Sequence, residues 1–185
     1  MAYFIGIDQS LRGTGVAVLE DDILVPVLLH RIETKALRAV TRLAAIRDAI
    51  KDLLIGYQPV LTAMEGYSYG STGRVFELGE AGGVIKLALY DQQRQFLIVP
   101  PSSLKLFVAD DGAADKAKMA RCTLAKWKRK IDQDDLCDAY GLARVARTMH
   151  TQTSTFRCEL EVIRSLGDKD YKPKMDAPSK VKRST

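Results

Sequence analysis

Four acidic residues stand where apolar segments end or a helix begins, and their side chains suit metal-dependent chemistry. Asp8 ends the run "FIGID", Glu65 ends "LTAME", and Asp135 and Asp138 lie in "DDLCDA". At a spacing of three, Asp135 and Asp138 share one face of a helix. Clustered carboxylates repel one another unless cations neutralise them. Two Mg²⁺ ions about 3.5–4 Å apart, with Mn²⁺ as a substitute, would activate water and stabilise the leaving oxygen in phosphodiester cleavage.

Each of these acids also has a simpler explanation. Asp8 could cap a turn, and Glu65 could be a strand-end charge that reaches water. Asp134 or Asp135 could be the N-cap or a first-turn acid of a helix. Taken together, two acids that each end a buried strand favour one shared metal site. A histidine site is not indicated, because His30 and His150 stand alone in their segments.

The hydrophobic pattern predicts strands first and helices later. Strands are expected over 3–9, 14–20 and 23–31, and Pro26 favours an edge position for the third. An amphipathic helix is predicted over 36–55, because apolar residues recur there every three or four positions: Leu37, Val40, Leu43, Ile46, Ile50 and Leu53. A short strand over 60–65, a loop over 66–73, a helix over 74–92 and a strand over 96–99 follow. Helices over 102–109, 114–127, 134–149 and 154–166 complete the pattern.

This order predicts an α/β fold with one mixed five-stranded sheet and helices on both faces. The first three strands are hairpin-linked and therefore antiparallel. The fourth and fifth are each reached through a helix and therefore run parallel to a neighbour, in the direction of the first. The strand over 60–65 would lie beside the strand over 3–9, so that Asp8 and Glu65 meet at one edge.

Charge and length suggest one domain with a polyanionic partner. The 185 residues carry a net charge of +5. Residues 1–166 form the expected domain, and the basic segment 167–185 is an expected disordered tail. Between Lys116 and Lys130 there are seven basic residues and no acidic one, with Trp127 among them. This run indicates either a nucleic-acid surface or only a solvated helix face.

The sequence offers no membrane span, signal peptide or disulfide framework. No apolar run reaches 18 residues. Cys122, Cys137 and Cys158 are odd in number and far apart, which is typical of buried thiols in a reducing compartment. We therefore expect a cytoplasmic protein, or one in the host cytoplasm if the source is viral, with no membrane partner.

Three motifs resemble the RuvC family of Holliday-junction resolvases, within the RNase H-like superfamily. They are "FIGIDQSLRGTGVAVLE", "AMEGY" and "DDLCDAYGLARVA", and the resemblance covers about residues 3–150. It implies an RNase H-like homodimer that resolves four-way DNA junctions by paired symmetric nicks. By that likeness, Asp8, Glu65, Asp135 and Asp138 hold two Mg²⁺ ions and Lys116 lies near the scissile phosphate. The family's D-x-x-D-A pattern favours Asp135 over Asp134.

Basic and aromatic side chains near these motifs are expected to contact DNA. They are Lys105, Lys118, Arg121, Arg12, Tyr67, Tyr69 and Arg74. The chain departs from the family at Gln9 and Ser10, where bacterial members usually have Pro-Gly, in the loop "GYSYGSTG", and in an extension past about residue 151. These departures concern substrate preference rather than metal chemistry.

Other function classes fit less of the sequence. Sugar kinases, actin and Hsp70-type ATPases share the first motif, but they need a second domain and an adenosine site. We therefore expect no nucleotide cofactor. A non-catalytic junction-binding protein would explain the basic run but not the four acids. A less selective branched-DNA or flap endonuclease stays open.

A resolvase with one set of acids per chain must act as a two-fold dimer, because it nicks two strands. The helix over 74–92 is the expected interface. Its small residues Gly79, Ala81, Gly82 and Gly83 would allow close approach, and Val84, Leu87 and Leu89 would supply apolar area. The alternative is that this helix packs wholly against its own sheet.

Overall fold

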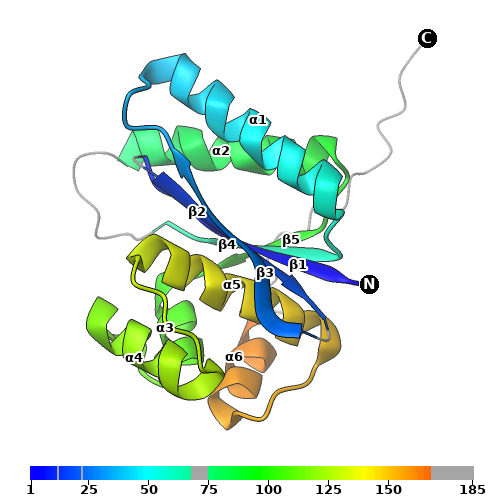
Figure 1. Ribbon diagram of the computed structural model, residues 1–185, viewed down its shortest axis with the longest axis vertical. Helices are drawn as coiled ribbons and strands as arrows, with labels where there is room; N and C mark the ends of the chain where they lie inside the picture. Colours follow the sequence, from blue (N-terminus) through cyan, green and yellow to red (C-terminus); the bar gives the residue numbers. More distant parts are fainter. Residues whose placement is uncertain (12, 22, 68–74, 168–185) are drawn as a thin grey trace.

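The five strands form one sheet in the order β3-β2-β1-β4-β5 (Figure 1). The computed structural model describes residues 1–11, 13–21, 23–67 and 75–167. Arg12, Tyr69, Arg74 and the tail 168–185 lie outside the described residues. β1 pairs antiparallel with β2 and β2 with β3, whereas β4 is parallel to both β1 and β5. The predicted mixed sheet is therefore confirmed.

The elements follow the predicted order with small shifts at their ends. They are β1 (Tyr3–Asp8), β2 (Gly13–Glu20), β3 (Ile23–Glu33), α1 (Ala39–Tyr57), β4 (Leu61–Glu65), α2 (Val75–Asp91), β5 (Phe96–Val99), α3 (Pro101–Ala109), α4 (Lys116–Trp127), α5 (Asp134–Thr151) and α6 (Arg157–Gly167). β3 is an edge strand, and its pairing with β2 shifts register next to Pro26. A proline lacks the N–H that a regular ladder needs, so this position suits it.

Two helical layers cover the two faces of the sheet (Figure 1). Side chains alternate along each strand, so neighbouring residues serve different cores. Ile5 and Ile7 of β1 pack in one core with α1 and α2. Phe4 of β1 and Ala63 of β4 pack in the other core, with α3 to α6. By the same alternation, Gly6, Asp8 and Glu65 face the layer that contains α5.

α5 approaches the sheet very closely because glycines lie beneath it. A Cβ placed on Gly6 would overlap the backbone of Ala139 and Ala143, and one placed on Gly15 would overlap the backbone of Asp135. A larger residue at either strand position would push the helix outward. The two glycines therefore set the distance between α5 and the sheet, and with it the position of the acids in the first turns of α5.

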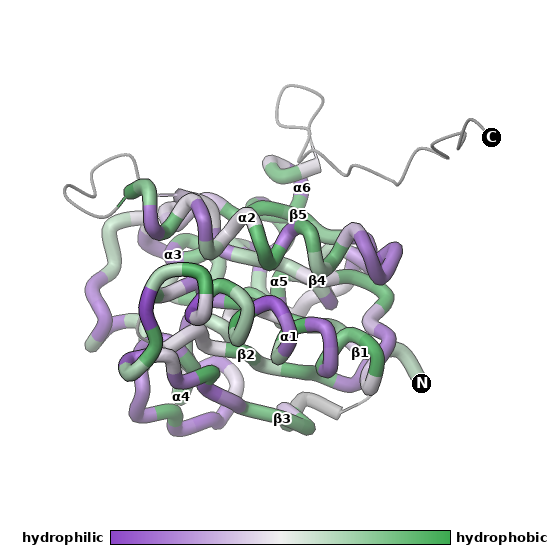
Figure 2. Tube along the Cα trace, turned by 90° about the horizontal axis from the view of Figure 1, so that it is seen from above, coloured by the Kyte–Doolittle hydropathy of each residue, from purple (hydrophilic) through white to green (hydrophobic). Residues whose placement is uncertain are grey.

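α1 begins at Ala39 rather than at residue 36. Arg38 is extended, with φ of −135°, and Ala39 has φ of 44°, so the chain enters the helix only there. Val40 was predicted on the apolar face but is 75 % exposed, whereas Ile46, Ile50 and Leu54 are buried. Hydrophobic and hydrophilic segments alternate along α1, as expected of an amphipathic helix (Figure 2).

In the described part of the chain, no helix combines the length and the apolar character that crossing a membrane requires. All three cysteines are free thiols. Cys137 is buried, but Cys122 and Cys158 are only half-buried, so the expectation that all are buried is wrong for two of them.

Candidate active site

Asp8 and Glu65 meet at the ends of two adjacent parallel strands. β1 and β4 run side by side in register, with Ile7 opposite Met64, so the next residues are neighbours at the same edge. Both side chains face α5. They are hydrogen-bonded to each other, with Asp8 as the donor and Glu65 as the acceptor. Two carboxyl groups this close cannot both ionise easily, so the pair keeps a proton unless a cation neutralises it.

The start of α5 brings the other two acids to this edge. Asp8, Asp135 and Asp138 line one cavity of about 480 Å³, which Ser10, Arg31, Lys116, Asp132, Gln133 and Asp134 also line. Glu65 and Asp138 line an adjoining cavity of about 250 Å³ with Lys105 and Lys116. Asp138 and Lys116 thus belong to both cavities. The four acids predicted from the sequence converge on one hollow edge of the sheet.

Burial raises the pKa of three of the acids at this edge, Asp8, Glu65 and Asp138, and neighbouring charges add to the rise at Asp8 and Asp138. Burial is the main cause that raises the pKa of Asp8 well above its usual range, and the Glu65 and Asp138 carboxylates raise it further. Burial also raises the pKa of Glu65, while Lys105 opposes the rise. The pKa of Asp138 is raised to about 7 by burial and by Glu65 and Asp134. The nearby lysines therefore do not offset the burial of Asp8, Glu65 and Asp138.

Two lysines stand at the rim of the acid cluster. Lys116 is the first residue of α4, whose N-cap is Asp115, and its ammonium lies 2.7 Å from Asp134. That hydrogen bond raises the pKa of Lys116, which stays charged. Lys105 of α3 lies beside Glu65 and Asp138 and acts on the charges of both. Both lysines therefore place positive charge beside the acids.

Comparison with known proteins gives the family. A profile of the family described as "Crossover junction endodeoxyribonuclease RuvC" matches residues 4–146. The chain belongs to the RuvC family. The RuvC of Mycobacterium avium is 27% identical over an alignment of 186 residues that covers 96% of this chain and 98% of that protein. The RuvC of Dictyoglomus thermophilum is 30% identical over an alignment of 144 residues that covers 75% of this chain and 91% of that protein.

Solved RuvC structures share the fold. Thermus thermophilus RuvC superposes with a TM-score of 0.69 at 19% identity, covering 82% of this chain and 97% of that one. T. thermophilus RuvC in complex with a Holliday junction substrate gives a TM-score of 0.67 at 20% identity, covering 77% and 91%. The resemblance inferred from the three motifs is therefore confirmed. RuvC membership implies dependence on a divalent metal ion in general terms.

The acid edge fits a divalent metal by its donor set. Its donors are carboxylate oxygens, which hard divalent cations prefer. Across the described ranges 1–11, 13–21, 23–67 and 75–167, no three acidic, histidine or cysteine side chains are gathered tightly enough to hold one ion. Two acids at this edge are instead held in ion pairs within the protein: Asp134 with Lys116, and Asp135 with Arg31.

Arg31 is the site residue that the sequence interpretation missed. It lies near the end of β3, opposite Gly15 of β2, which in turn lies opposite Asp8 of β1. Its guanidinium donates to Asp135 and to Glu33. The antiparallel hairpin was the available signal, because it returns the end of β3 to the edge that holds Asp8.

The other predicted DNA-contact residues that the structure describes lie outside the two cavities that hold the acids. Lys118 pairs with Asp111 at 2.6 Å, and Arg121 is exposed on α4. Tyr67 is 38% exposed; its hydroxyl donates to the Gly79 carbonyl oxygen, and Lys86 lies 5.0 Å from its ring centre. Tyr67 therefore leans on α2, next to the acid edge.

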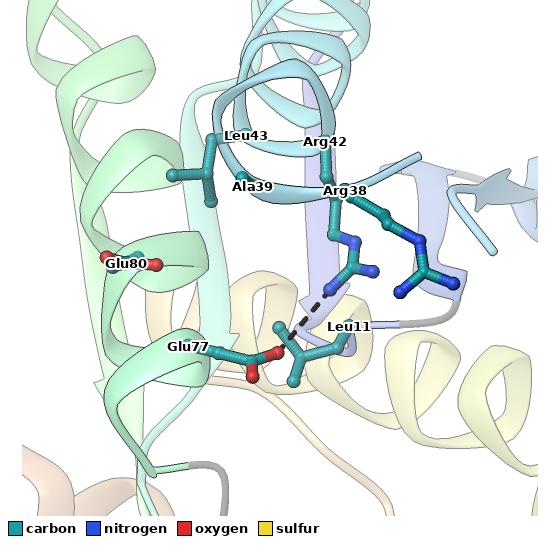
Figure 3. A pocket seen from close by; sticks show the side chains of 7 residues that line it. All are labelled: Leu11, Arg38, Ala39, Arg42, Leu43, Glu77 and Glu80. Carbon is teal, nitrogen blue, oxygen red and sulfur yellow. Dashed lines mark ion pairs between the residues drawn. The ribbon is translucent and has the colours of Figure 1, made fainter. Parts of the chain in front are cut away.

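A separate cavity between α1 and α2 carries no acid of the site. It has a volume of about 340 Å³ (Figure 3). Arg38 and Arg42 extend from the start of α1 toward Leu11, and Arg42 pairs with Glu77 of α2 at 3.5 Å. Arg42 also donates to the Leu37 carbonyl oxygen. These contacts tie α1 to α2.

The raised pKa values predict an unusual pH dependence of stability. A native carboxyl whose pKa is raised binds protons more tightly than the unfolded chain does, so the free energy of unfolding falls as pH rises. For Asp138 this window runs from the ordinary value of 3.8 to about 7. In EDTA, we expect the protein to lose roughly 4 kcal/mol over this window from this group.

Thermal unfolding at pH 5 and pH 8 measures this effect. Asp138→Asn removes the titration and should flatten the difference between the two pH values, and Mg²⁺ added at pH 8 should restore much of the wild-type loss. Asp52→Asn, at an exposed position on α1, is the control. A wild-type free energy of unfolding that rises steadily from pH 5 to pH 8 in EDTA would contradict the burial argument.

Proposed function

We propose that this protein is a metal-dependent endonuclease that resolves four-way DNA junctions by paired nicks. The convergence of Asp8, Glu65, Asp135 and Asp138 at one sheet edge supports this proposal most directly. An acidic cluster facing a polyanion is unfavourable unless cations lie between them. A purely DNA-binding protein would have no use for such a cluster.

The four acids hold two Mg²⁺ ions in this proposal. Bound Mg²⁺ would supply an activated water and stabilise the leaving oxygen of the phosphodiester. Asp8 and Glu65 are held by rigid strand ends, and Asp138 by the first turns of α5. Lys116 and Lys105 flank Asp138 and would hold the scissile phosphate against the ions. Charge-assisted contacts of this kind are short and strong.

The DNA surface surrounds this hollow. Lys118 and Arg121 on α4 extend the positive charge from Lys116, and these side chains would follow the phosphate backbone. Tyr67 would stack on an unpaired base at the junction centre, after giving up its contact with Gly79. We propose DNA contacts for Arg12, Tyr69 and Arg74 as well, from their sequence positions alone.

The outer face of α2 supports a dimer. Phe76 is 90% exposed, Leu87 59% and Tyr90 41%. Gly79 and Gly83 open onto free space, so a second backbone could approach closely there. In contrast, Ala81 and Leu89 are buried in their own core and Gly82 lies under Tyr67 and Gln9, so these three cannot serve the interface. We propose the outward residues as the two-fold contact.

Leu87→Glu should dissociate the dimer. A charge at the centre of an apolar contact cannot be paired there, so sedimentation at micromolar concentration should give a monomer. The same variant should nick one strand of a junction per binding event instead of two. Ile55→Glu, at a position on α1 that is 56% exposed, is the control and should stay dimeric. A Leu87→Glu protein that sediments as a dimer would remove α2 from the interface.

Asp134→Asn and Asp135→Asn should separate the two neighbouring acids. We expect Asp135→Asn to be inactive because it removes a metal ligand. Asp134 is not the helix cap, since Gln133 occupies that position and gives no side-chain cap. Its pair with Lys116 is half-exposed, and such pairs contribute about 0–1 kcal/mol. Asp134→Asn should therefore fold normally and keep most of its activity; the reverse pattern would reassign the ligand.

Cleavage of four-way, three-way, flap and linear DNA, compared side by side with Mg²⁺, tests the function. A resolvase gives paired nicks at symmetry-related positions of opposing strands in the four-way junction. Preferential single nicks in the flap would favour the less selective endonuclease instead. We propose that residues 1–166 carry this activity, that the tail 167–185 adds only charge, and that the protein acts in the cytoplasm where its DNA lies.

A further inference from the structure

We propose that Arg31 is a positioning residue that exchanges Asp135 for a DNA phosphate, and so couples cation binding to junction binding. This inference rests on the proposed function. In the absence of DNA, Arg31 competes with the divalent cation for the Asp135 carboxylate. When a junction binds, the guanidinium moves to the DNA backbone and releases Asp135 to the cation.

Both oxygens of Asp135 are engaged within the protein. Oδ2 accepts from Nε of Arg31, and Oδ1 accepts at 3.0 Å from the backbone N–H of Leu136. Each oxygen keeps a second acceptor site. A divalent cation that takes Asp135 as a ligand would nevertheless lie beside the positive guanidinium, which opposes its binding. The bond to Leu136 is local to the helix, whereas the bond to Arg31 joins α5 to a different strand. Arg31 is the partner that a side-chain rotation can remove.

The side chain of Arg31 reaches Asp135 through space that is free only because Gly13 and Gly15 have no side chains. Its side chain starts from β3, opposite Gly15 of β2, and Asp135 lies directly above Gly15. A Cβ placed on Gly13 would overlap the guanidinium of Arg31. The contact between Arg31 and Asp135 thus depends on these two glycines. Gly13→Ala would add one methyl group that deflects Arg31 without altering any charge.

The surroundings of Arg31 support its proposed position on a DNA phosphate. The side chain is 27% exposed and lines the same cavity as Asp8 and Lys116, so it already borders the space where the DNA strand would lie. A guanidinium binds a phosphate through two parallel N–H donors, as it does a carboxylate. Glu33, its other partner, is half-exposed and would release it at little cost.

Exchange of this kind has a thermodynamic consequence. If junction binding frees Asp135, the junction raises the affinity for the cation, and by reciprocity the cation raises the affinity for the junction by the same factor. The enzyme would then load its full metal set mainly on DNA. The alternative is that Arg31 simply braces β3 against α5; in that case its loss would lower stability and leave free-protein cation affinity unchanged or weaker.

Two binding measurements without turnover test the proposal. Mn²⁺ affinity of the free protein is measured by the EPR signal of unbound Mn²⁺, and four-way junction affinity is measured in EDTA by fluorescence anisotropy. Arg31→Gln should bind Mn²⁺ about tenfold more tightly, because a charge-assisted competitor is removed. The same variant should bind the junction several-fold more weakly, because a phosphate contact is lost. Arg31→Lys should restore much of both values.

Two further variants keep the test independent of folding defects. Gly13→Ala retains both charges but deflects Arg31, and it should also tighten Mn²⁺ binding. Arg147→Gln removes a comparable pair, between α5 and Asp21 at 3.3 Å, and should change neither affinity. Unchanged or weaker Mn²⁺ binding by folded Arg31→Gln, or junction binding equal to wild type, overturns the proposal. A wild-type protein that binds no Mn²⁺ and cuts no junction would instead refute the proposed function itself.

Discussion

Asp8→Asn is expected to lower junction cleavage by at least about a thousandfold, while junction affinity stays within a few-fold. The substitution removes one ligand charge from a metal site worth several kcal/mol of transition-state stabilisation, and each 1.36 kcal/mol is tenfold in rate. The shape of the side chain is kept, and the basic residues on α3 and α4 are untouched. Single-turnover cleavage with Mg²⁺ and junction binding in EDTA measure the two quantities.

The same variant should be more stable than the wild type in EDTA at pH 8. Burial raises the pKa of Asp8 well above its usual range, so deprotonating this carboxyl is costly in the folded protein. An amide keeps a donor for Glu65 and carries no charge. A gain in stability with a loss of activity is typical of active-site residues. Cleavage at the wild-type rate would refute the role of Asp8 as a metal ligand.

Gly6→Ala is expected to lower cleavage by about a hundredfold and to destabilise the fold by about 3 kcal/mol or more. The added Cβ would overlap the Ala139 carbonyl and the Ala143 N–H, both of which are backbone atoms that cannot rotate away. α5 must therefore move outward, and Asp138 moves with it. Overpacking costs about 1–3 kcal/mol, sometimes more, and a displacement of 1 Å can cost about a hundredfold in rate.

A matched glycine controls for the substitution itself. Gly56 lies near the end of α1, and a Cβ there has no neighbour within 4 Å. Gly56→Ala should be neutral or slightly stabilising, by up to about 1 kcal/mol, because alanine favours a helix. Denaturant unfolding and single-turnover cleavage compare the two variants. If Gly6→Ala folds and cuts like the wild type, α5 does not depend on this close approach.

Residue alternation was sufficient to predict which strand ends carry the site. "FIGID" and "LTAME" each place an acid in step with residues that face one layer of helices, and the helical crossover requires parallel neighbours. The placement of Asp8 beside Glu65 followed from these two local rules. In the same way, the spacing of Asp135 and Asp138 predicted one helix face. Such periodic features involve residues that are close in the sequence, so the sequence alone is enough to recognise them.

Helix boundaries and helix faces were less predictable. The apolar period over 36–55 included Val40, which is exposed because α1 starts only at Ala39 and turns that residue outward. Similarly, the glycines and apolar residues of α2 could not be divided between its two faces from their types. Gly82 lies under Tyr67 and Gln9, whereas Gly79 and Gly83 open onto free space, because α1 and the sheet cover only one side of the helix.

The sequence by itself determined the order of strands and helices, the strand ends that bear Asp8 and Glu65, and the helix that bears Asp135 and Asp138. Only the tertiary structure decided the charge partners: Arg31 with Asp135, and Lys116 with Asp134. The physical reason is the distance along the chain over which each kind of interaction acts. Alternation and helical period act between near neighbours in the chain, but an ion pair depends on where long, flexible side chains end after distant elements have packed. Arg31 and Asp135 are 104 residues apart, and they meet only because Gly13 and Gly15 leave room between them.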